Sequence, residues 1–187
     1  LSMEVINYGA IITNLNVPDS SGSLKDVVLG FNDFNNYYEN NPYFGAIIGR
    51  YGNRISNGTF LLDGVRYELE QNNGTNSLHG GLVGFDKVFW KFIEEKSSNQ
   101  SLYFEYYSKD MEGGFPGNLV VGVEYILNDS NELKIKYTAS TDKKTIINLT
   151  QHSYFNLSGE SSGDILDHIL NIDAEYYLPV NENMIPY

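Results

Sequence analysis

Histidine is the residue type in this 187-residue chain best suited to proton transfer, because its unperturbed pKa lies near neutrality. The chain has three: His79, His152 and His168. His79 lies in a polar, glycine-rich stretch, 71–84, and the two glycines after it would let the backbone approach a ligand closely. Long loops in compact domains are often functional. A lone histidine is nevertheless more often structural than catalytic, so both interpretations stay open.

His152 lies in another polar segment, residues 148–157, which read NLTQHSYFNL. In an extended strand, His152 would share a face with Thr150 and Tyr154. Their hydroxyl groups could hold the imidazole in one tautomer and orient a ligand. His168 lies in an alternating, surface-like run, 164–170, and we do not retain it as a site residue.

A second polar cluster covers residues 49–58, where Arg50 and Arg54 stand four positions apart with Asn53 between them. A guanidinium group offers a planar set of donors, and an amide adds one acceptor and two donors. This combination suits the recognition of hydroxyl or carboxylate groups. The alternative is a turn with two arginines that face solvent.

Several familiar sites are missing from the sequence. No third ligand stands at zinc spacing from the histidines, and there is no cysteine to supply a thiolate ligand, a nucleophile or a disulfide. No G-x-S-x-G nucleophile motif, phosphate-binding loop or dinucleotide fingerprint is present. We therefore expect neither a metal nor a cofactor.

The charge balance narrows the class of partner. Lys and Arg number 12 against 24 Asp and Glu, so the formal net charge is −12. Such a chain repels phosphate backbones and anionic lipids, so we expect no nucleic-acid or membrane partner. No apolar run has the length of a membrane span and no signal peptide is visible. Together with the absence of cysteine, this favours a cytoplasmic protein. We expect a monomer or a dimer.

The elements that must position these residues are mostly strands. Residues 119–127 and 132–139 alternate apolar and polar side chains, and Leu102, Phe104 and Tyr106 repeat the pattern. Asp63-Gly64 between two apolar runs predicts a tight hairpin, and residues 128–131 predict another hairpin loop.

Helical periodicity is nearly absent. Only residues 34–39 predict a short helix, with Asp33 as its N-cap. Many short strands without intervening helices favour an all-β sandwich or barrel. We see no internal repeat, linker or domain boundary, and expect residues 1–187 to form a single partial domain.

Five motifs, in order along the chain, carry a resemblance to a known family. They are residues 49–55 (GRYGNRI) followed by 60–64 (FLLDG), residues 73–81 (NGTNSLHGG) followed by 84–87 (GFDK) and Trp90, residues 112–119 (EGGFPGNL), residues 148–157 (NLTQHSYFNL) and residues 177–186 (YLPVNENMIP). Together they resemble the aldose 1-epimerases, the galactose mutarotase family. Gln151 stands where the family usually has Asn. The likeness runs from about Val5 to Pro186.

The resemblance implies a large antiparallel β-sandwich that holds a hexose in an open groove, incomplete in this chain. It also implies a mutarotase reaction. A glutamate would take the proton of the anomeric C1 hydroxyl while a histidine protonates the ring oxygen. The ring then opens to the aldehyde, C1 rotates, and the ring closes on its other face.

The family's roles carry over to this sequence by motif position. His152 would donate the proton, and His79 would bind and polarise the sugar beside the ring oxygen. Asn53 and Arg54 would hydrogen-bond sugar hydroxyls. With Tyr154, which would lie beside His152, these are our candidate site residues; His79 and His152 are the catalytic candidates.

The likeness also predicts what this chain lacks. Family members continue well beyond the point matching Tyr187, and their glutamate base and a sugar-binding aspartate lie in that later part. The opening strand also looks absent. We therefore expect the 187 residues alone to be inactive and to be an incomplete part of an active enzyme.

Two alternatives stay open. One is a non-catalytic carbohydrate-binding protein of the same fold. The other is a related enzyme, such as a hexose-6-phosphate epimerase or the mutarotase part of a fused UDP-galactose epimerase. A phosphosugar enzyme should carry extra Arg or Lys at its groove, and the charge of −12 disfavours it.

Overall fold

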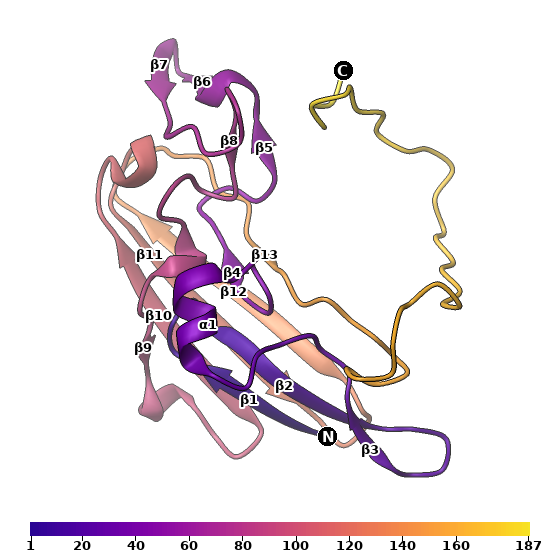
Figure 1. The fold of residues 1–187 in the computed structure, drawn as a ribbon. Helices are drawn as coiled ribbons and strands as arrows, with labels where there is room; N and C mark the ends of the chain where they lie inside the picture. Colours follow the sequence, from indigo (N-terminus) through magenta and orange to yellow (C-terminus); the bar gives the residue numbers. More distant parts are fainter.

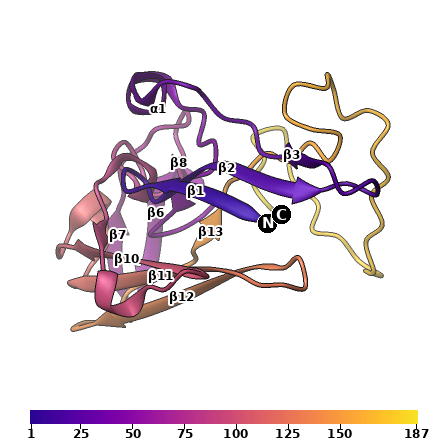
Figure 2. The ribbon, with the colours of Figure 1, turned by 90° about the horizontal axis from the view of Figure 1, so that it is seen from below.

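Two antiparallel sheets face each other in the computed structural model, which describes residues 1–187 apart from the side chain of Asn40. One sheet has the order β1-β2-β3, from Ser2–Ile6, Ile11–Pro18 and Leu24–Asp26. The other has the order β12-β11-β10-β9, from Leu133–Thr141, Leu119–Leu127, Ser101–Ser108 and Lys91–Phe92. Figure 2 shows the two layers edge-on, with β1 and β2 over β10, β11 and β12. This confirms the expected all-β class.

The core lies between the layers because the alternation of the strands turns one apolar face inward. Val121, Val123 and Tyr125 of β11 are fully buried. They belong to one apolar cluster with Ile12 and Leu15 of β2. The Tyr125 hydroxyl donates to the carbonyl oxygen of Ala10 at 2.8 Å and so links the layers directly.

The long strands follow the sequence expectation closely. β11 pairs with β12 in unbroken register from Leu119↔Thr141 to Leu127↔Leu133. Leu133, Ile135 and Tyr137 pack against the core as expected, whereas Ala139 is exposed at the end of the strand. Residues 128–131 form the expected hairpin loop, with Asn131 at a positive φ of 60°.

The short elements are also where the patterns placed them. Helix α1 (Phe34–Asn40) begins at Asp33, whose Oδ1 accepts from the Asn35 amide at 2.9 Å. Strands β6 (Thr59–Leu62) and β7 (Val65–Glu68) form the hairpin predicted at Asp63-Gly64. Both turn residues have positive φ, 51° and 78°, as a type I′ turn requires.

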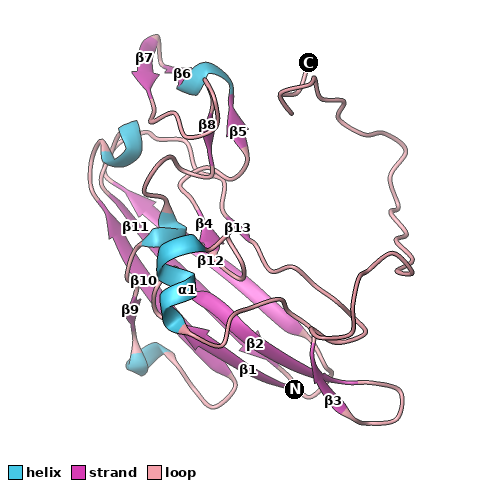
Figure 3. Cartoon of the chain, in the orientation of Figure 1, coloured by secondary structure: helices cyan, strands magenta, loops and turns pink.

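The remaining strands have two residues each and form two separate pairs. β4 (Ile47–Ile48) pairs with β13 (Thr150–Gln151), and β5 (Arg54–Ile55) pairs with β8 (Ser77–Leu78). Short 3₁₀ turns cover Ser56–Gly58, Phe85–Lys87, Glu94–Lys96 and Glu112–Gly114. Figure 1 shows β4 and β13 beside each other between α1 and the β5–β8 end of the molecule, and Figure 3 shows how little of the chain is helical.

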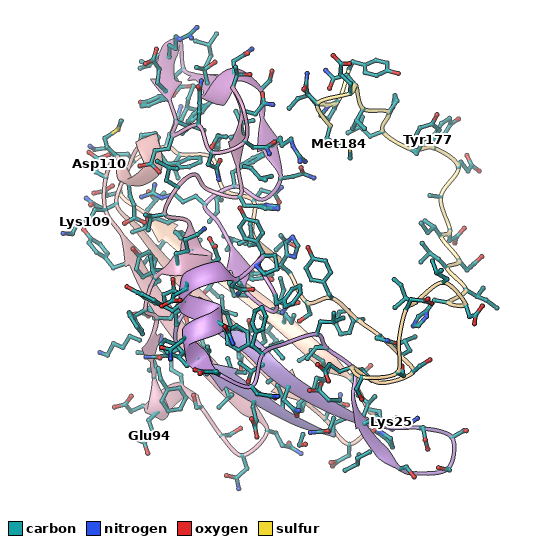
Figure 4. The ribbon with its side chains drawn as sticks, viewed as in Figure 1. Lys25, Glu94, Lys109, Asp110, Tyr177 and Met184 are labelled. Atoms are coloured by element: carbon teal, nitrogen blue, oxygen red, sulfur yellow. The ribbon has the colours of Figure 1, made fainter. Side chains whose placement is uncertain are left out.

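The segment after residue 163 differs from the rest, because it lies away from the sheets as an extended outer loop (Figure 1). Tyr177 and Met184, labelled in Figure 4, lie on it. Its apolar side chains are open to solvent, with exposed fractions of 96% for Ile169 and 82% for Leu170. No helix of the described residues is long and apolar enough to span a membrane.

Candidate active site

His79 and His152 lie together although 73 positions separate them in the sequence, and their ring centroids are 5.2 Å apart. They line a hollow of about 530 Å³, which we call the histidine hollow. The remaining residues that line it are Gly52, Asn53, Asn148, Leu149, Thr150, Gln151 and Ser153. The hollow therefore joins two of the sequence motifs, the one around Asn53 and the one around His152.

His79 is held by Asn53 through two hydrogen bonds. The backbone amide of His79 donates to the backbone carbonyl of Asn53 at 3.1 Å, and the backbone amide of Asn53 donates to His79 Nδ1 at 2.9 Å. Because Nδ1 accepts a hydrogen bond, a neutral His79 carries its proton on Nε2. His79 also has a positive φ of 56°, which is unusual for a residue with a side chain.

The glycine-rich loop that carries His79 is more ordered than its composition suggests. It contains strand β8, and Asn72 fixes it internally. The Asn72 amide nitrogen donates to the carbonyls of Leu78 at 2.9 Å and Gly81 at 2.8 Å, while its oxygen accepts from the Leu78 amide at 2.7 Å. The lack of a side chain at Gly80 serves the packing of the loop itself, since a Cβ there would clash with the Gly49 carbonyl.

His152 is positioned by backbone pairing with the segment before β4. Its amide donates to the Ala46 carbonyl at 2.9 Å, and its carbonyl accepts from the Gly45 amide at 3.2 Å. The extended strand expected through Thr150 and Tyr154 is wrong, because β13 ends at Gln151. The Gln151 side chain donates from Nε2 to the Gly45 carbonyl at 3.0 Å and to Ser153 Oγ at 2.7 Å, and its Oε1 accepts from the Ser153 amide at 2.9 Å.

Tyr154 nevertheless lies beside His152, with ring centroids 5.1 Å apart and 42% of the tyrosine exposed. Thr150 is exposed on the hollow, and no hydrogen bond joins it to His152 among the described residues. His168 lies elsewhere, and its Nε2 accepts from the Leu157 amide at 3.0 Å. That contact gives His168 a structural role.

The two arginines of the 49–58 cluster have different environments. Arg54 donates from Nε to Asn73 Oδ1 at 2.9 Å and from Nη1 to Asn53 Oδ1 at 3.3 Å, so it lies at the rim beside the hollow. Arg50 is only 2% exposed and bonds Ser108 and the carbonyl of Pro116. Both interpretations of the arginine cluster, ligand binding and exposure to solvent, are therefore wrong for Arg50. Its side chain links the chain at Arg50 to Ser108 of β10 and to Pro116.

The hollow disfavours a charged His79. Burial lowers the pKa of His79 to about 4, and electrostatic interactions with His152, Arg54 and Lys87 act in the same direction. At neutral pH His79 is therefore a neutral imidazole with its N–H at Nε2. Such a group can donate a hydrogen bond but is a poor source of a free proton.

The structure brings a further group to the histidines that the sequence did not assign. The Tyr43 ring lies 4.8 Å from His79 and 5.5 Å from His152, centroid to centroid. Lys87 Nζ lies 5.2 Å from the centre of the Tyr43 ring and 2.7 Å from Asp86 Oδ2. Asp86 and Lys87 belong to the GFDK motif, which was the only signal for them; nothing in the sequence indicated Tyr43.

Comparisons with known proteins match the whole chain. The family model described as aldose 1-epimerase matches residues 1–187. The chain is 48% identical to a galactose mutarotase of Sus scrofa, covering 100% of this chain and 53% of that protein. It is 40% identical to an aldose 1-epimerase of Escherichia coli, covering 99% of this chain and 53% of that protein.

Solved structures agree. An aldose epimerase homologue from C. elegans matches with a TM-score of 0.92 and 32% identity, over 98% of this chain and 55% of that one. A galactose 1-epimerase from Lactobacillus acidophilus matches with a TM-score of 0.84 and 29% identity, over 99% of this chain and 53% of that one. The chain thus spans about half the length of these relatives, and it belongs to the aldose 1-epimerase family.

Proposed function

We propose that the protein carrying this chain interconverts the α and β anomers of hexoses such as galactose and glucose. The observation that carries the proposal is the pair of imidazoles in one hollow, 5.2 Å apart, with Asn53 and Arg54 beside it. Membership of the aldose 1-epimerase family and the names of the relatives support the same reaction.

The environments of the two histidines support different roles. His79, with its pKa lowered to about 4, stays neutral and presents Nε2–H as a fixed hydrogen-bond donor. It can orient the sugar and polarise an oxygen atom. His152 is then the imidazole that gives its proton to the ring oxygen, which is general acid catalysis.

The proton balance of the reaction is simple. A base removes the proton of the C1 hydroxyl, the C1–O5 bond breaks, and O5 takes the proton of His152. The open-chain aldehyde rotates about C1–C2, and the same steps in reverse close the ring on the other face. We assign the base to a glutamate in the part of the protein beyond these 187 residues, as the family resemblance implies.

The lining of the hollow favours a neutral sugar. Of the described residues that line it, none is Lys or Arg, and most offer amide, hydroxyl or imidazole groups suited to hydroxyl recognition. A phosphosugar would need a cationic contact there. We further propose that residues 1–187 are one part of a single cytoplasmic, cofactor-free domain, monomeric or dimeric.

The test is polarimetry on the full-length gene product. Fresh α-D-galactose and α-D-glucose should reach anomeric equilibrium much faster with the protein than in buffer. A full-length protein that binds galactose calorimetrically but leaves the rate at the buffer value would be a carbohydrate-binding protein instead. Rapid conversion of hexose 6-phosphates alone would favour the phosphosugar alternative.

A further inference from the structure

An ion pair between the buried carboxylate of Asp86 and the partly exposed ammonium group of Lys87 lies near the two histidines and has no role in the reaction as described above. Asp86 is only 4% exposed, and its Oδ1 has no hydrogen-bond partner among the described residues. Its Oδ2 pairs with Lys87 Nζ at 2.7 Å. A half-satisfied buried carboxylate is costly, and an apolar side chain would serve stability better. The pair therefore calls for an explanation other than stability.

The segment that carries the pair is fixed tightly against the histidine loop. A Cβ on Gly84 would lie 2.5 Å from the His79 carbonyl oxygen and 2.7 Å from Asp86 Oδ1. On the other side, the indole Nε1–H of Trp90 donates to the Phe85 carbonyl at 3.0 Å, and both rings are in the core. Asp86 thus stands between the rigid core and the backbone of the loop that carries His79.

Contacts run from the pair to both imidazoles. The ammonium group of Lys87 stands 5.2 Å from the centre of the Tyr43 ring, within the range of a cation–π interaction. That ring makes a T-shaped contact with His79 at 4.8 Å and a tilted contact with His152 at 5.5 Å. Lys87 therefore constrains Tyr43, and Tyr43 in turn contacts both histidines.

We propose that Asp86 and Lys87 are positioning residues for the two histidines, with Asp86 holding Lys87 and Lys87 holding Tyr43 against both imidazole rings. The inference rests on the proposed function and deepens it. Neither residue touches the sugar in this account; they act through Tyr43 and through their charges. The two charges have opposite sign, so removing Asp86 and removing Lys87 should shift the pKa of His79 in opposite directions.

The charged and titratable groups around the imidazoles support this role. Burial raises the pKa of Asp86, while Lys87 and, more weakly, His152 lower it, so the carboxylate and His152 interact. Lys87 is among the groups that lower the pKa of His79, after burial, His152 and Arg54. The groups facing the two rings are Tyr43, Arg54, Asp86, Lys87 and Tyr154, together with the other histidine.

The test is an NMR titration of the histidine ring protons in the full-length protein. In Lys87→Met the loss of a positive charge should raise the pKa of His79 above about 4. In Asp86→Asn the ammonium group is left uncompensated, so the pKa of His79 should fall. Lys87→Arg keeps the cation and its place over the tyrosine ring and should restore the titration of the parent protein.

Lys136→Met is the matched control. It removes a lysine that pairs with Glu124 at 3.4 Å on the solvent side of the sheet, and it should leave the titration of His79 unchanged. Unchanged titrations in Lys87→Met, or shifts that Lys87→Arg fails to reverse, would overturn the inference. Lys87→Met and Lys87→Arg keep Asp86, so the titration of these two variants tests the inference even if Asp86→Asn does not fold.

Steady-state kinetics give a second, independent test of the inference. With the proposed reaction, Lys87→Met should lower kcat by about tenfold through misplaced imidazoles and leave KM near its original value. A rise in KM with unchanged kcat would contradict the positioning role. Because the titration does not depend on turnover, a full-length protein without mutarotase activity would refute the proposed function while the titration still reports on the pair.

Discussion

The four-stranded sheet and the histidine hollow use the backbone in opposite ways. In the sheet, β10 and β11 stay in register from Ser101↔Ile126 to Ser108↔Leu119, and alternation places Val121, Val123 and Tyr125 on the buried face. In the hollow, the paired strands have two residues, and positive φ angles and side-chain hydrogen bonds set the geometry. The sheet supplies stability, and the irregular region around the hollow can hold polar groups in positions that a regular strand would not allow.

This comparison predicts that removing a group from the hollow changes the reaction more than the fold. His152→Ala in the full-length protein should lower the polarimetric rate by about 10²–10⁴-fold, because the proposed proton donor to the ring oxygen is lost. His168→Ala is the control, since its ring accepts a hydrogen bond from the Leu157 amide and does not line the hollow. Near-normal turnover in His152→Ala would remove His152 from the donor role.

Removing a core side chain from the sheet should lower the stability of the fold and leave the reaction rate unchanged. Phe104 is 3% exposed in the main apolar cluster, so Phe104→Ala should lower the free energy of unfolding by about 3–5 kcal/mol. Urea unfolding measures this loss, and the folded variant should keep its kcat. Leu61→Ala, at a side chain that is 73% exposed, should cost less than about 0.5 kcal/mol. Equal losses for the two variants would contradict the assignment of the core.

The burial of His79 in the hollow should also make the stability of the protein depend on pH. His79 has a pKa of about 4 when folded and about 6.5 when unfolded, so the unfolded chain binds one proton more between these values. Stability is therefore full above pH 6.5 and falls as the pH drops toward 4, by at most about 3 kcal/mol. The raised pKa of buried Asp86 opposes part of this loss.

His79→Gln isolates that effect. Gln cannot titrate, so urea unfolding between pH 7 and pH 4 should show a flatter stability profile than the parent protein. An identical slope in both proteins would mean that His79 titrates normally. In that case the neutral, hydrogen-bond-donating role given to it would fail.

The smallest expected effect is at the rim. Arg54→Ala should raise KM several-fold, equivalent to about 1 kcal/mol, by removing a hydroxyl contact, with kcat nearly unchanged. Arg66→Ala on the β6–β7 hairpin is the control, because that arginine is exposed and makes only a 3.7 Å contact with Glu68. An unchanged KM in Arg54→Ala would assign Arg54 to holding Asn53 and Asn73 in place.

The sequence alone determined the regular part of this protein. Alternation placed β10, β11 and β12, Asp63-Gly64 placed a hairpin, and Asp33 placed the start of α1, because each depends on neighbouring residues and local geometry. The motifs determined the family. They also marked His79 and His152, although as separate positions in two segments.

The tertiary structure decided what the histidines can do. It ended β13 before His152, buried Arg50, and brought Tyr43 and the Asp86–Lys87 pair to the imidazoles. None of these follows from local pattern, because each depends on contacts between residues far apart in sequence and on the desolvation that packing imposes. A histidine in a sequence has an ordinary pKa; only its burial in the fold makes His79 a neutral donor.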